Sequence, residues 1–238
     1  MEEISKLITN SLWEGGEIGY YFSASKGSAG GLLIMWRTSY VSILSSFCGN
    51  EFLGIKVSWK SGIYYIVNIY SSCSLSLKRV LWRDLLILKN NFTDGDWLFG
   101  GDFNAVKTRN ERVGSSVNMN ATGRRDFSIF IDSSGLVDVP CKGRKYSWYS
   151  GDGRSKSRID RFLVSDSIVS SWGVAGLLIG LWDVSDHCPV WLEVDKEDWG
   201  PKPFKFNNEW FSNKDFLPFV EKHWKAMVVR GRSDFVLK

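Results

Sequence analysis

The sequence has few of the residues that build disulfide or zinc scaffolds. Its four cysteines are widely separated and form no CxxC pair, and its two histidines fit no zinc-binding spacing. Neither a disulfide framework nor a structural zinc site is therefore expected. We predict that Cys48, Cys73, Cys141 and Cys188 are reduced, buried thiols of an intracellular protein.

Long apolar runs are also absent. No stretch approaches the ~18 consecutive apolar residues of a membrane-spanning helix, and the first residues, MEEISKLITN, lack the apolar core of a signal peptide. We expect a protein without a membrane partner that is not secreted and resides in the nucleus or the cytoplasm.

The composition that remains is that of a globular protein. Hydrophobic residues make up 44% of the 238 positions and charged residues 24%, with 12 tryptophans, so a sizeable aromatic core can form. This length suits one main domain. The net charge of +4 and the pI near 8.8 weakly favour an anionic partner and allow nucleic acid.

Proline is scarce. Two of the five prolines, Pro201 and Pro203, lie close together, where the amino-acid composition of the sequence changes. This pair predicts an extended linker. We expect one domain over 1–196 and a tail over 197–238 whose amphipathic helix runs from about Asn213 to Val229. The tail residues expected to pack on one face of that helix are Phe216, Phe219, Val220, His223, Trp224 and Met227.

Strands dominate the first part of the chain, and helices then alternate with strands. Short apolar runs rich in Ile, Val, Tyr and Trp follow Gly30, and the break Lys60-Ser61-Gly62 predicts a hairpin. A serine-capped helix follows, with an apolar stripe of Leu77, Leu81, Leu85 and Leu88. A second helix carries Phe127, Phe130 and Ile131 and ends at Gly135. The pattern predicts an α/β fold of two packed mixed sheets flanked by helices.

Polar clusters stand at the ends of four predicted strands. They are Asn68-Ile69-Tyr70, Gly101-Asp102-Phe103-Asn104, Arg158-Ile159-Asp160-Arg161 and Ser185-Asp186-His187-Cys188-Pro189. Phosphodiester hydrolysis needs a hard divalent ion held by oxygen ligands, an activated water and donors that neutralise charge on the phosphate. The aspartates, asparagines, tyrosine and histidine of these clusters are residue types that can supply such ligands, bases and donors.

In order and spacing, GDFN, SRIDRFLVS and SDHCP resemble the signature motifs of the endonuclease/exonuclease/phosphatase superfamily, over residues 1 to about 196. The fold that this resemblance implies is a four-layer α/β sandwich. With SGLVDVPCKGRKYSWYS, the sequence is most similar to the endonuclease domains of plant non-LTR (LINE-type) retrotransposons, where such a domain precedes a reverse transcriptase. The resemblance implies Mg²⁺ as cofactor, with Mn²⁺ as a substitute, and DNA as partner.

The resemblance also implies a role for six residues. Asp102 would position or deprotonate the attacking water, and Asn104 would hydrogen-bond that water or the phosphate. His187 would contact the scissile phosphate, and Asp160 would fix its tautomer and charge. The two remaining roles belong to Tyr70, whose phenol would donate to a phosphate oxygen, and to Asp186, the metal-proximal aspartate.

The chain departs from the family pattern at its start. The family's first strand carries an asparagine, and its second ends in a Gln-Glu-Thr-Lys-like motif whose glutamate is the principal metal ligand; Met1 falls where that motif would have just ended. We therefore expect an N-terminally truncated domain that lacks these strands and nicks DNA poorly. Glu2 and Glu3 are expected to face the dipole of a following helix and not a metal.

Two further sets of residues leave alternatives open. Trp148 and Tyr149 would stack on a base or pack in the core. Basic residues flank both central motifs, where they would contact phosphates or form an ordinary solvated surface; they are Lys107, Arg109, Arg112, Arg124, Arg125, Arg154, Lys156 and Arg158.

Three functions compete at this stage. The first is a metal-dependent endonuclease that nicks DNA. The second is a catalytically inactive remnant that at most binds nucleic acid, and the third is a phosphatase of the same superfamily acting on inositol phosphates or sphingolipids. The oligomeric state is left open.

Overall fold

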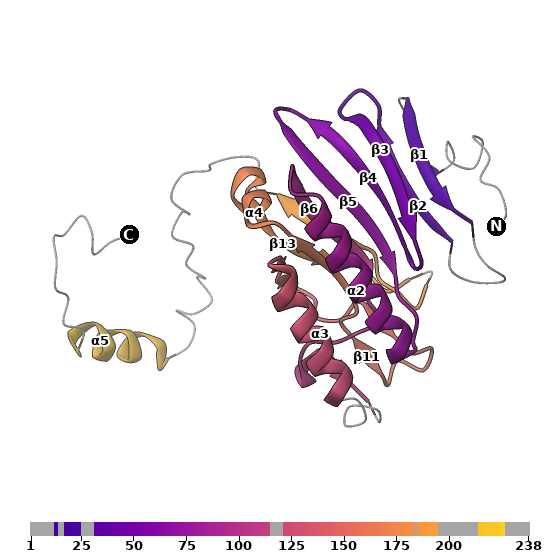
Figure 1. The fold of residues 1–238 in the computed structure, drawn as a ribbon. Coiled ribbons are helices and arrows are strands. Elements are labelled where there is room, and N and C mark those ends of the chain that lie inside the picture. Colours follow the sequence, from indigo (N-terminus) through magenta and orange to yellow (C-terminus); the bar gives the residue numbers. More distant parts are fainter. Residues whose placement is uncertain are drawn as a thin grey trace. The chain divides into compact units, whose positions relative to one another are not determined.

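The computed structural model describes most of the chain (Figure 1). The described residues are 12–13, 17–24, 31–114, 121–183, 185–194 and 214–226. The chain divides into two units, 1–196 and 197–238. The start of the chain, with Glu2 and Glu3, lies outside the described residues.

The largest sheet of the first unit has six strands in the order β3-β4-β5-β6-β12-β8. Their bounds are β3 Ser42–Gly49, β4 Phe52–Trp59, β5 Gly62–Tyr70, β6 Asp96–Asp102, β8 Val137–Asp138 and β12 Asp160–Val164. β5 and β6 are parallel, and the other neighbours are antiparallel. The predicted hairpin joins β4 to β5, with Trp59 opposite Gly62 and Lys60 in the left-handed region at φ 51°.

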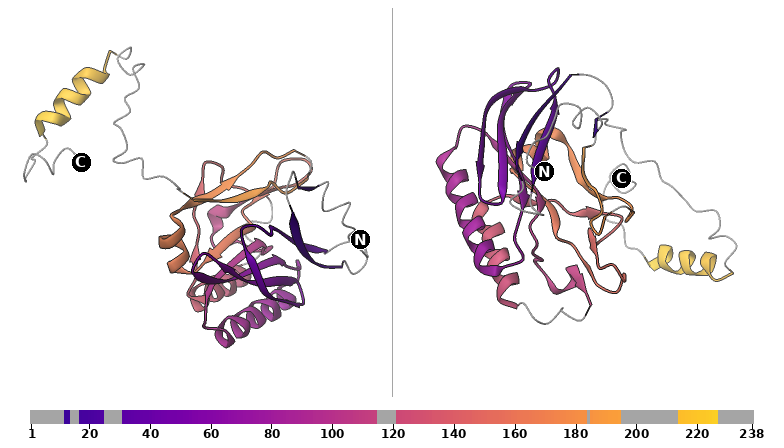
Figure 2. Two further views of the ribbon diagram at one scale, coloured as in Figure 1. Left: turned by 90° about the horizontal axis from the view of Figure 1, so that it is seen from above. Right: turned by 90° about the vertical axis from the view of Figure 1, so that its right-hand side faces the viewer.

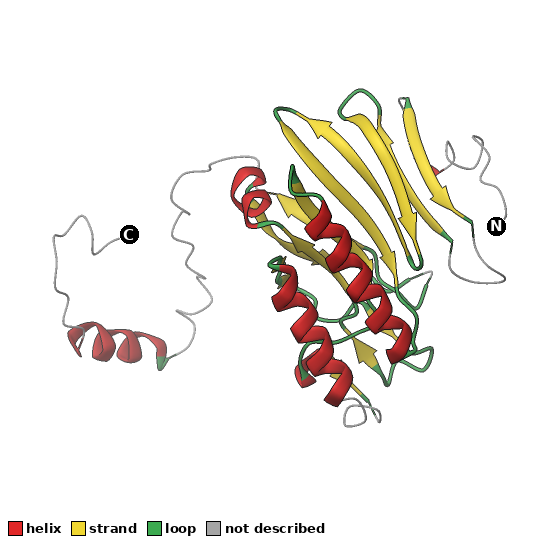
Figure 3. Cartoon of the chain, viewed as in Figure 1, coloured by secondary structure: helices red, strands yellow, loops and turns green. Residues whose placement is uncertain are grey.

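The other described strands form three smaller sheets (Figure 3). β1 pairs with β2, β13 lies between β14 and β9, and β11 lies between β10 and β7. β13 is antiparallel to β14 and parallel to β9, so this sheet is mixed. The bounds are β1 Ile18–Ser23, β2 Leu32–Arg37, β7 Arg112–Val113, β9 Cys141–Lys142, β10 Trp148–Tyr149, β11 Lys156–Ser157, β13 Val174–Ile179 and β14 Val190–Val194.

Helices flank these sheets. In the first unit the elements are α2 Leu75–Asn91, the 3₁₀ turn η1 Arg109–Glu111, α3 Ala121–Ser134 and α4 Asp166–Trp172. α3 ends at Gly135, with φ 62°, as predicted. Ser74 occupies the N-cap of α2, but its side chain makes no capping hydrogen bond.

The buried stripe of α2 differs from the predicted one. Leu81 and Leu85 are buried as expected, but Leu77 is 50% exposed. The stripe is turned by one residue, so that Lys78 and Trp82 face the interior in its place. Lys78 lies three, four and seven residues before the buried Leu81, Trp82 and Leu85, which is the spacing of one helical face.

Two cores lie on opposite faces of the six-stranded sheet. The helices α2 and α3 lie on one side of this sheet, and the later strands lie on the other (Figure 2, right). Successive residues of β5 show the alternation of a strand covered on both sides: Tyr65 and Val67 pack beneath α2 and α3, whereas Tyr64 belongs to the core under β13. Trp82 and Phe130 stack in the first core, with ring centroids 5.8 Å apart. The predicted class, packed mixed sheets flanked by helices, is confirmed.

The cysteines are free, but the prediction that all are buried is wrong. Only Cys188 is buried; Cys141 is half-buried, and Cys48 and Cys73 are exposed. Cys48 lies on β3, which is an edge strand of the large sheet among the described residues.

The second unit contains α5, Phe216–Ala226, a helix shorter than the predicted segment. His223 donates from Nδ1 to the carbonyl oxygen of Phe219 at 2.8 Å, and the two rings lie 4.0 Å apart. Leu217, Phe219 and Val220 are exposed. Met227 and the side chain of Trp224 lie outside the described part of the chain.

No helix in the described ranges is long and apolar enough to cross a membrane.

Candidate active site

The large sheet brings three of the predicted site residues into one row. β6 lies between β5 and β12, with Tyr70 opposite Asp102 and Asp102 opposite Asp160. Paired residues on neighbouring strands point to the same face of a sheet. The two carboxylates are buried, and they therefore share one face at the end of their strands.

A tight turn follows β6 and fixes Asn104. Gly101 has φ 130°, and a Cβ there would lie 2.2 Å from the carbonyl oxygen of Ile69, so only glycine fits. The Asp102 carboxylate accepts a hydrogen bond of 2.7 Å from the backbone N–H of Asn104. Asn104 adopts φ 49°, a region that asparagine tolerates, and its side-chain amide donates to the carbonyl oxygen of Ser71 at 3.2 Å.

The loop that carries His187 is held against β10. The backbone N–H of Tyr149 donates to the carbonyl oxygen of Asp186 at 2.9 Å, and that of Cys188 donates to Ser147 at 2.7 Å. The Ser147 hydroxyl oxygen in turn accepts from the backbone N–H of Asp160 at 3.0 Å. One segment therefore positions both the end of β12 and the histidine loop.

His187 lies between the two buried aspartates. Its Nδ1 is 3.0 Å from Oδ2 of Asp160, and its Nε2 is 3.9 Å from Oδ2 of Asp102. The hydrogen bond to Asp160 raises the pKa of His187, with burial acting in the opposite direction and the charges of Asp160, Asp102 and Asp186 adding to the increase. The pair resembles other carboxylate–histidine pairs in which the carboxylate orients the ring and stabilises its charged form.

Burial raises the pKa of Asp102 to about 6, and the neighbouring charge of Asp160 raises it further, against the opposing hydrogen bond from Asn104. A carboxyl group that titrates near neutral pH is suited to accept a proton under physiological conditions.

Asp186 is placed beside the cluster and not inside it. Its exposed carboxylate accepts a hydrogen bond from Nε1 of Trp148 at 2.9 Å, and this bond lowers the pKa of Asp186. Carboxylate oxygens suit a hard ion such as Mg²⁺, and such ions are commonly held by one or two carboxylates together with water and substrate phosphate. Among the described residues, no group of three or more His, Cys, Asp or Glu could hold a metal ion.

Tyr70 contributes its backbone position but not its ring to this arrangement. Its side chain is 41% exposed and lines a hollow together with Glu51 and Ser72. Among the described residues, the hydrogen bonds and ion pairs of Asp102, Asp160 and His187 do not involve the Tyr70 phenol.

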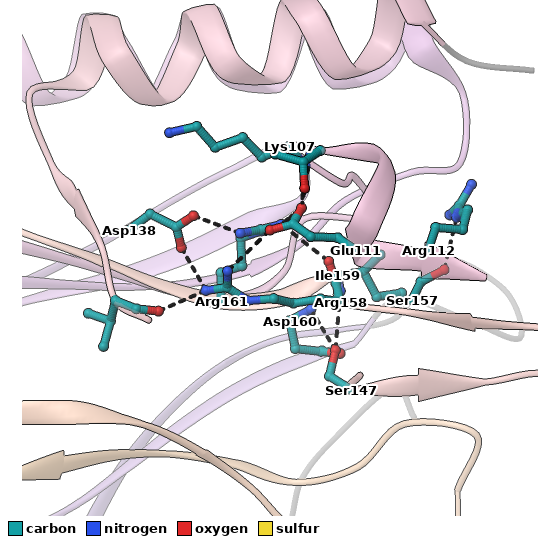
Figure 4. A network of polar contacts seen from close by, with 12 residues as sticks. Lys107, Glu111, Arg112, Asp138, Ser147, Ser157, Arg158, Ile159, Asp160 and Arg161 are labelled. Atoms are coloured by element: carbon teal, nitrogen blue, oxygen red, sulfur yellow. Dashed lines mark hydrogen bonds and ion pairs between the residues drawn. The ribbon is translucent and has the colours of Figure 1, made fainter. Parts of the chain in front are cut away.

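A buried ion network behind β12 was not foreseen from the sequence (Figure 4). Arg161 is 0% exposed and binds the carboxylates of Glu111 and Asp138. Arg158 binds the same two carboxylates. The solvated-surface alternative is therefore wrong for Arg158, and its two ion pairs favour a structural role over phosphate contact. The sequence feature that could have indicated this network is Arg161, a charged residue inside an apolar strand.

The aromatic pair on β10 packs within the protein. Tyr149 stacks on Trp182 with ring centroids 5.2 Å apart, and Trp148 is tied to Asp186. Both side chains are half-buried, which favours packing and positioning over stacking on a base.

Solved structures with a similar fold include an endonuclease domain. The endonuclease domain of TRAS1, a telomere-specific non-LTR retrotransposon, matches with a TM-score of 0.57 and 12% identity, covering 73% of this chain and 78% of that one. Humanized TDP2 of D. rerio matches with a TM-score of 0.48 and 17% identity over 77% of each chain. Beta toxin of Staphylococcus aureus matches with a TM-score of 0.47 and 15% identity, over 71% of this chain and 70% of the other. A search of curated proteins finds no match.

The sequence profile described as the Endonuclease/Exonuclease/phosphatase family matches residues 4–187, which include Asp102, Asp160 and His187. The match spans most of the chain and every element of the site. The chain belongs to the Endonuclease/Exonuclease/phosphatase family.

Proposed function

We propose that this protein hydrolyses phosphodiester bonds of DNA with the help of a divalent metal ion, as a nicking endonuclease of plant-type retrotransposon descent that works, or once worked, in fusion with a reverse transcriptase. One observation carries the proposal: His187 lies between two carboxylates of different character. Asp160 stabilises the positive charge of His187, and Asp102 has a pKa raised to about 6. This arrangement separates a cationic group from a base within one site.

The residues divide the chemistry as follows. Asp102, in its deprotonated form, orients and deprotonates the attacking water. His187, charged by its bond to Asp160, donates from Nε2 to a non-bridging oxygen of the phosphate and stabilises the negative charge that develops there. Asn104 is held by Asp102 and Ser71 at the edge of the same site, where its side chain contacts the water or the phosphate.

Mg²⁺ is the cofactor of this proposal, with Mn²⁺ as a substitute, and Asp186 is the carboxylate assigned to it. When bound, the ion supplies positive charge next to the phosphate. The oxygen donors of Asp186 fit such an ion in chemical type, and its exposure leaves room for water and phosphate ligands.

DNA is favoured over a small phosphate ester by the basic residues close to the site. Lys107, Arg109 and Arg112 follow the turn at Asn104, and Arg124 and Arg125 open α3. Arg109 and Arg125 are exposed, and the other three are half-buried. Cations spread over several elements suit a polyanionic backbone better than a single phosphate group.

The test is a plasmid-nicking assay with Mg²⁺, with Mn²⁺ and with EDTA. We expect the open-circular product to form only with a divalent ion, and Asp102→Ala and His187→Ala to slow nicking by about a hundredfold or more. Asp84→Asn, on the outside of α2, serves as the charge-matched control. Binding of DNA without nicking would indicate the inactive remnant instead, and hydrolysis of inositol phosphates or sphingolipids without nicking would indicate the phosphatase.

A further inference from the structure

A small basic pocket opens next to the site, on the side of the helices. Its volume is about 220 Å³, below the roughly 300 Å³ at which pockets begin to hold drug-sized ligands. Three cations from three elements line it: Lys78 of α2, Arg112 of β7 and Arg124 of α3. Its remaining described lining is Cys73, Leu75, Trp82, Asn104, Ala105, Val106 and Gly123. None of these described lining residues is acidic.

Lys78 is the unusual member of this set. It is only 6% exposed, and lysine is almost never buried without a paired charge. Its Nζ donates to the backbone carbonyl oxygen of Asn104 at 2.5 Å. Among the described residues, no carboxylate lies within ion-pair distance of it. A buried ammonium group held by a neutral oxygen is costly and would be stabilised by an anion.

Arg112 adds to this demand. Arg112 donates from Nε to the Ser157 hydroxyl oxygen at 2.9 Å, which leaves its positive charge without neutralisation by that partner. Burial lowers the pKa of Arg112, and the charge of Arg124 lowers it further. Burial likewise lowers the pKa of Lys78, to which the charge of Arg112 contributes. The charge of Arg112 therefore opposes those of Lys78 and Arg124.

Asn104 connects the pocket to the chemistry. It lines the pocket, its carbonyl oxygen accepts from Lys78, and its backbone N–H donates to Asp102. An anion held here would lie on the helix side of the turn that carries the proposed base. α2 and α3, which supply Lys78 and Arg124, pack side by side (Figure 1).

We propose that Lys78, Arg112 and Arg124 form a subsite for one backbone phosphate of the DNA strand, next to the phosphate that is hydrolysed. The proposal rests on the proposed function for the identity of the polyanion. Its size fits a phosphodiester group, and the apolar part of its wall fits the adjoining sugar. Two arginines can each give bidentate hydrogen bonds to phosphate, and the lysine adds a point charge.

The test measures binding, not cleavage. A short fluorescein-labelled DNA duplex is titrated with the full chain in EDTA, and anisotropy gives the dissociation constant over a range of salt. Arg124→Gln and Arg83→Gln each remove one positive charge, but only Arg124 lines the pocket. Arg83 is exposed on α2, where it pairs with Asp84. We expect Arg124→Gln to weaken binding about threefold to tenfold and to lower the salt slope by about one. Arg112→Gln should act like Arg124→Gln, and thermal melts check that each variant is folded.

A scan with single neutral methylphosphonate linkages identifies the phosphate. One linkage should weaken binding of the wild type and of Arg83→Gln while leaving Arg124→Gln unaffected. The subsite is overturned if every linkage acts equally on Arg124→Gln and the wild type, or if Arg83→Gln weakens binding as much as Arg124→Gln. It is also overturned if the chain shows no salt-dependent binding of DNA. If one linkage weakens binding of the wild type but not of Arg124→Gln, and no plasmid nicking occurs, the proposed hydrolysis fails and the subsite stands.

Discussion

At the scale of single residues, the site combines groups whose environments work against stability. Asp102 is buried beside a second carboxylate, and the resulting pKa of about 6 means that its ionised form is disfavoured in the folded protein. Such a cost is common at active sites, where the charge is needed for chemistry. This cost can be measured at Asp102, and the opposite effect, stabilisation of a charged group, can be measured at His187.

Replacing Asp102 by asparagine should stabilise the protein at neutral pH. The folded-state pKa of about 6 lies above the usual value of 3.8, so the contribution of Asp102 is favourable below pH ~4 and is lost as the pH rises through 6. Asparagine carries no charge and keeps an oxygen for the N–H of Asn104. We expect urea unfolding at pH 7.5 to show a gain of about 2 to 3 kcal/mol that vanishes near pH 4. A variant less stable than the wild type at pH 7.5 would contradict the burial argument.

Replacing Asp160 by asparagine should lower the pKa of His187, because the hydrogen bond from Nδ1 to Asp160 is the main cause of its increase. Proton NMR titration of the imidazole measures this directly. A background variant, His223→Gln, leaves one histidine signal to follow. Asp186→Asn should shift the same titration less, since Asp186 raises the pKa of His187 through its charge and not through a hydrogen bond, and contributes less than Asp160. Equal shifts in both variants would argue against the Asp160 pair.

At the scale of elements, the sequence predicts the strand ends well and the buried charges poorly. Asp102 and Asp160 interrupt apolar strands, so their place at the end of β6 and β12 could be read directly. Arg161 follows Asp160 and was assigned no role, because a charged residue in a strand is ordinarily taken to face solvent. Its burial depends on Glu111, 50 residues away in the chain, and only tertiary structure shows such a partner. Lys78 escaped notice for the same reason.

The network around Arg161 should be essential for the stability of β12. Glu111 binds Arg161 and Arg158, and it also accepts from the backbone N–H of Lys107 at 2.6 Å. It thereby ties the loop after β6 to the strand that carries Asp160. Glu111→Gln leaves a fully buried guanidinium short of one negative charge, which costs about 3 to 5 kcal/mol. Urea unfolding at pH 7 measures the loss.

The exposed pair of Arg79 and Asp126, 2.6 Å apart, provides the control for that experiment. Asp126→Asn removes the same charge from a surface pair and should cost less than about 1 kcal/mol. A similar small cost for Glu111→Gln would show that the network tolerates loss of a partner and does not hold β12 in place.

At the scale of the whole molecule, the end of the family match lies close to the boundary between the two units. The matched region stops at residue 187, and the first unit ends at Lys196. The second unit has 42 residues, 197–238, and chains of about 40 residues rarely form an independent core without metal or disulfides. The sequence change at Pro201 and Pro203 was the available signal for this boundary.

Removing residues 197–238 should therefore leave the first unit folded. Both hydrophobic cores are built from residues between Tyr21 and Leu192, and every described residue of the candidate site lies within the same span. We expect the chain ending at Lys196 to unfold in urea with a midpoint and slope close to those of the full chain, with a free energy of unfolding lower by less than about 1 kcal/mol. Within the tail, Phe219→Ser serves as a milder variant, because it removes an exposed aromatic ring without shortening the chain. A loss of several kcal/mol on deletion, together with a clear loss for Phe219→Ser, would show that α5 packs against the first unit and belongs to its fold.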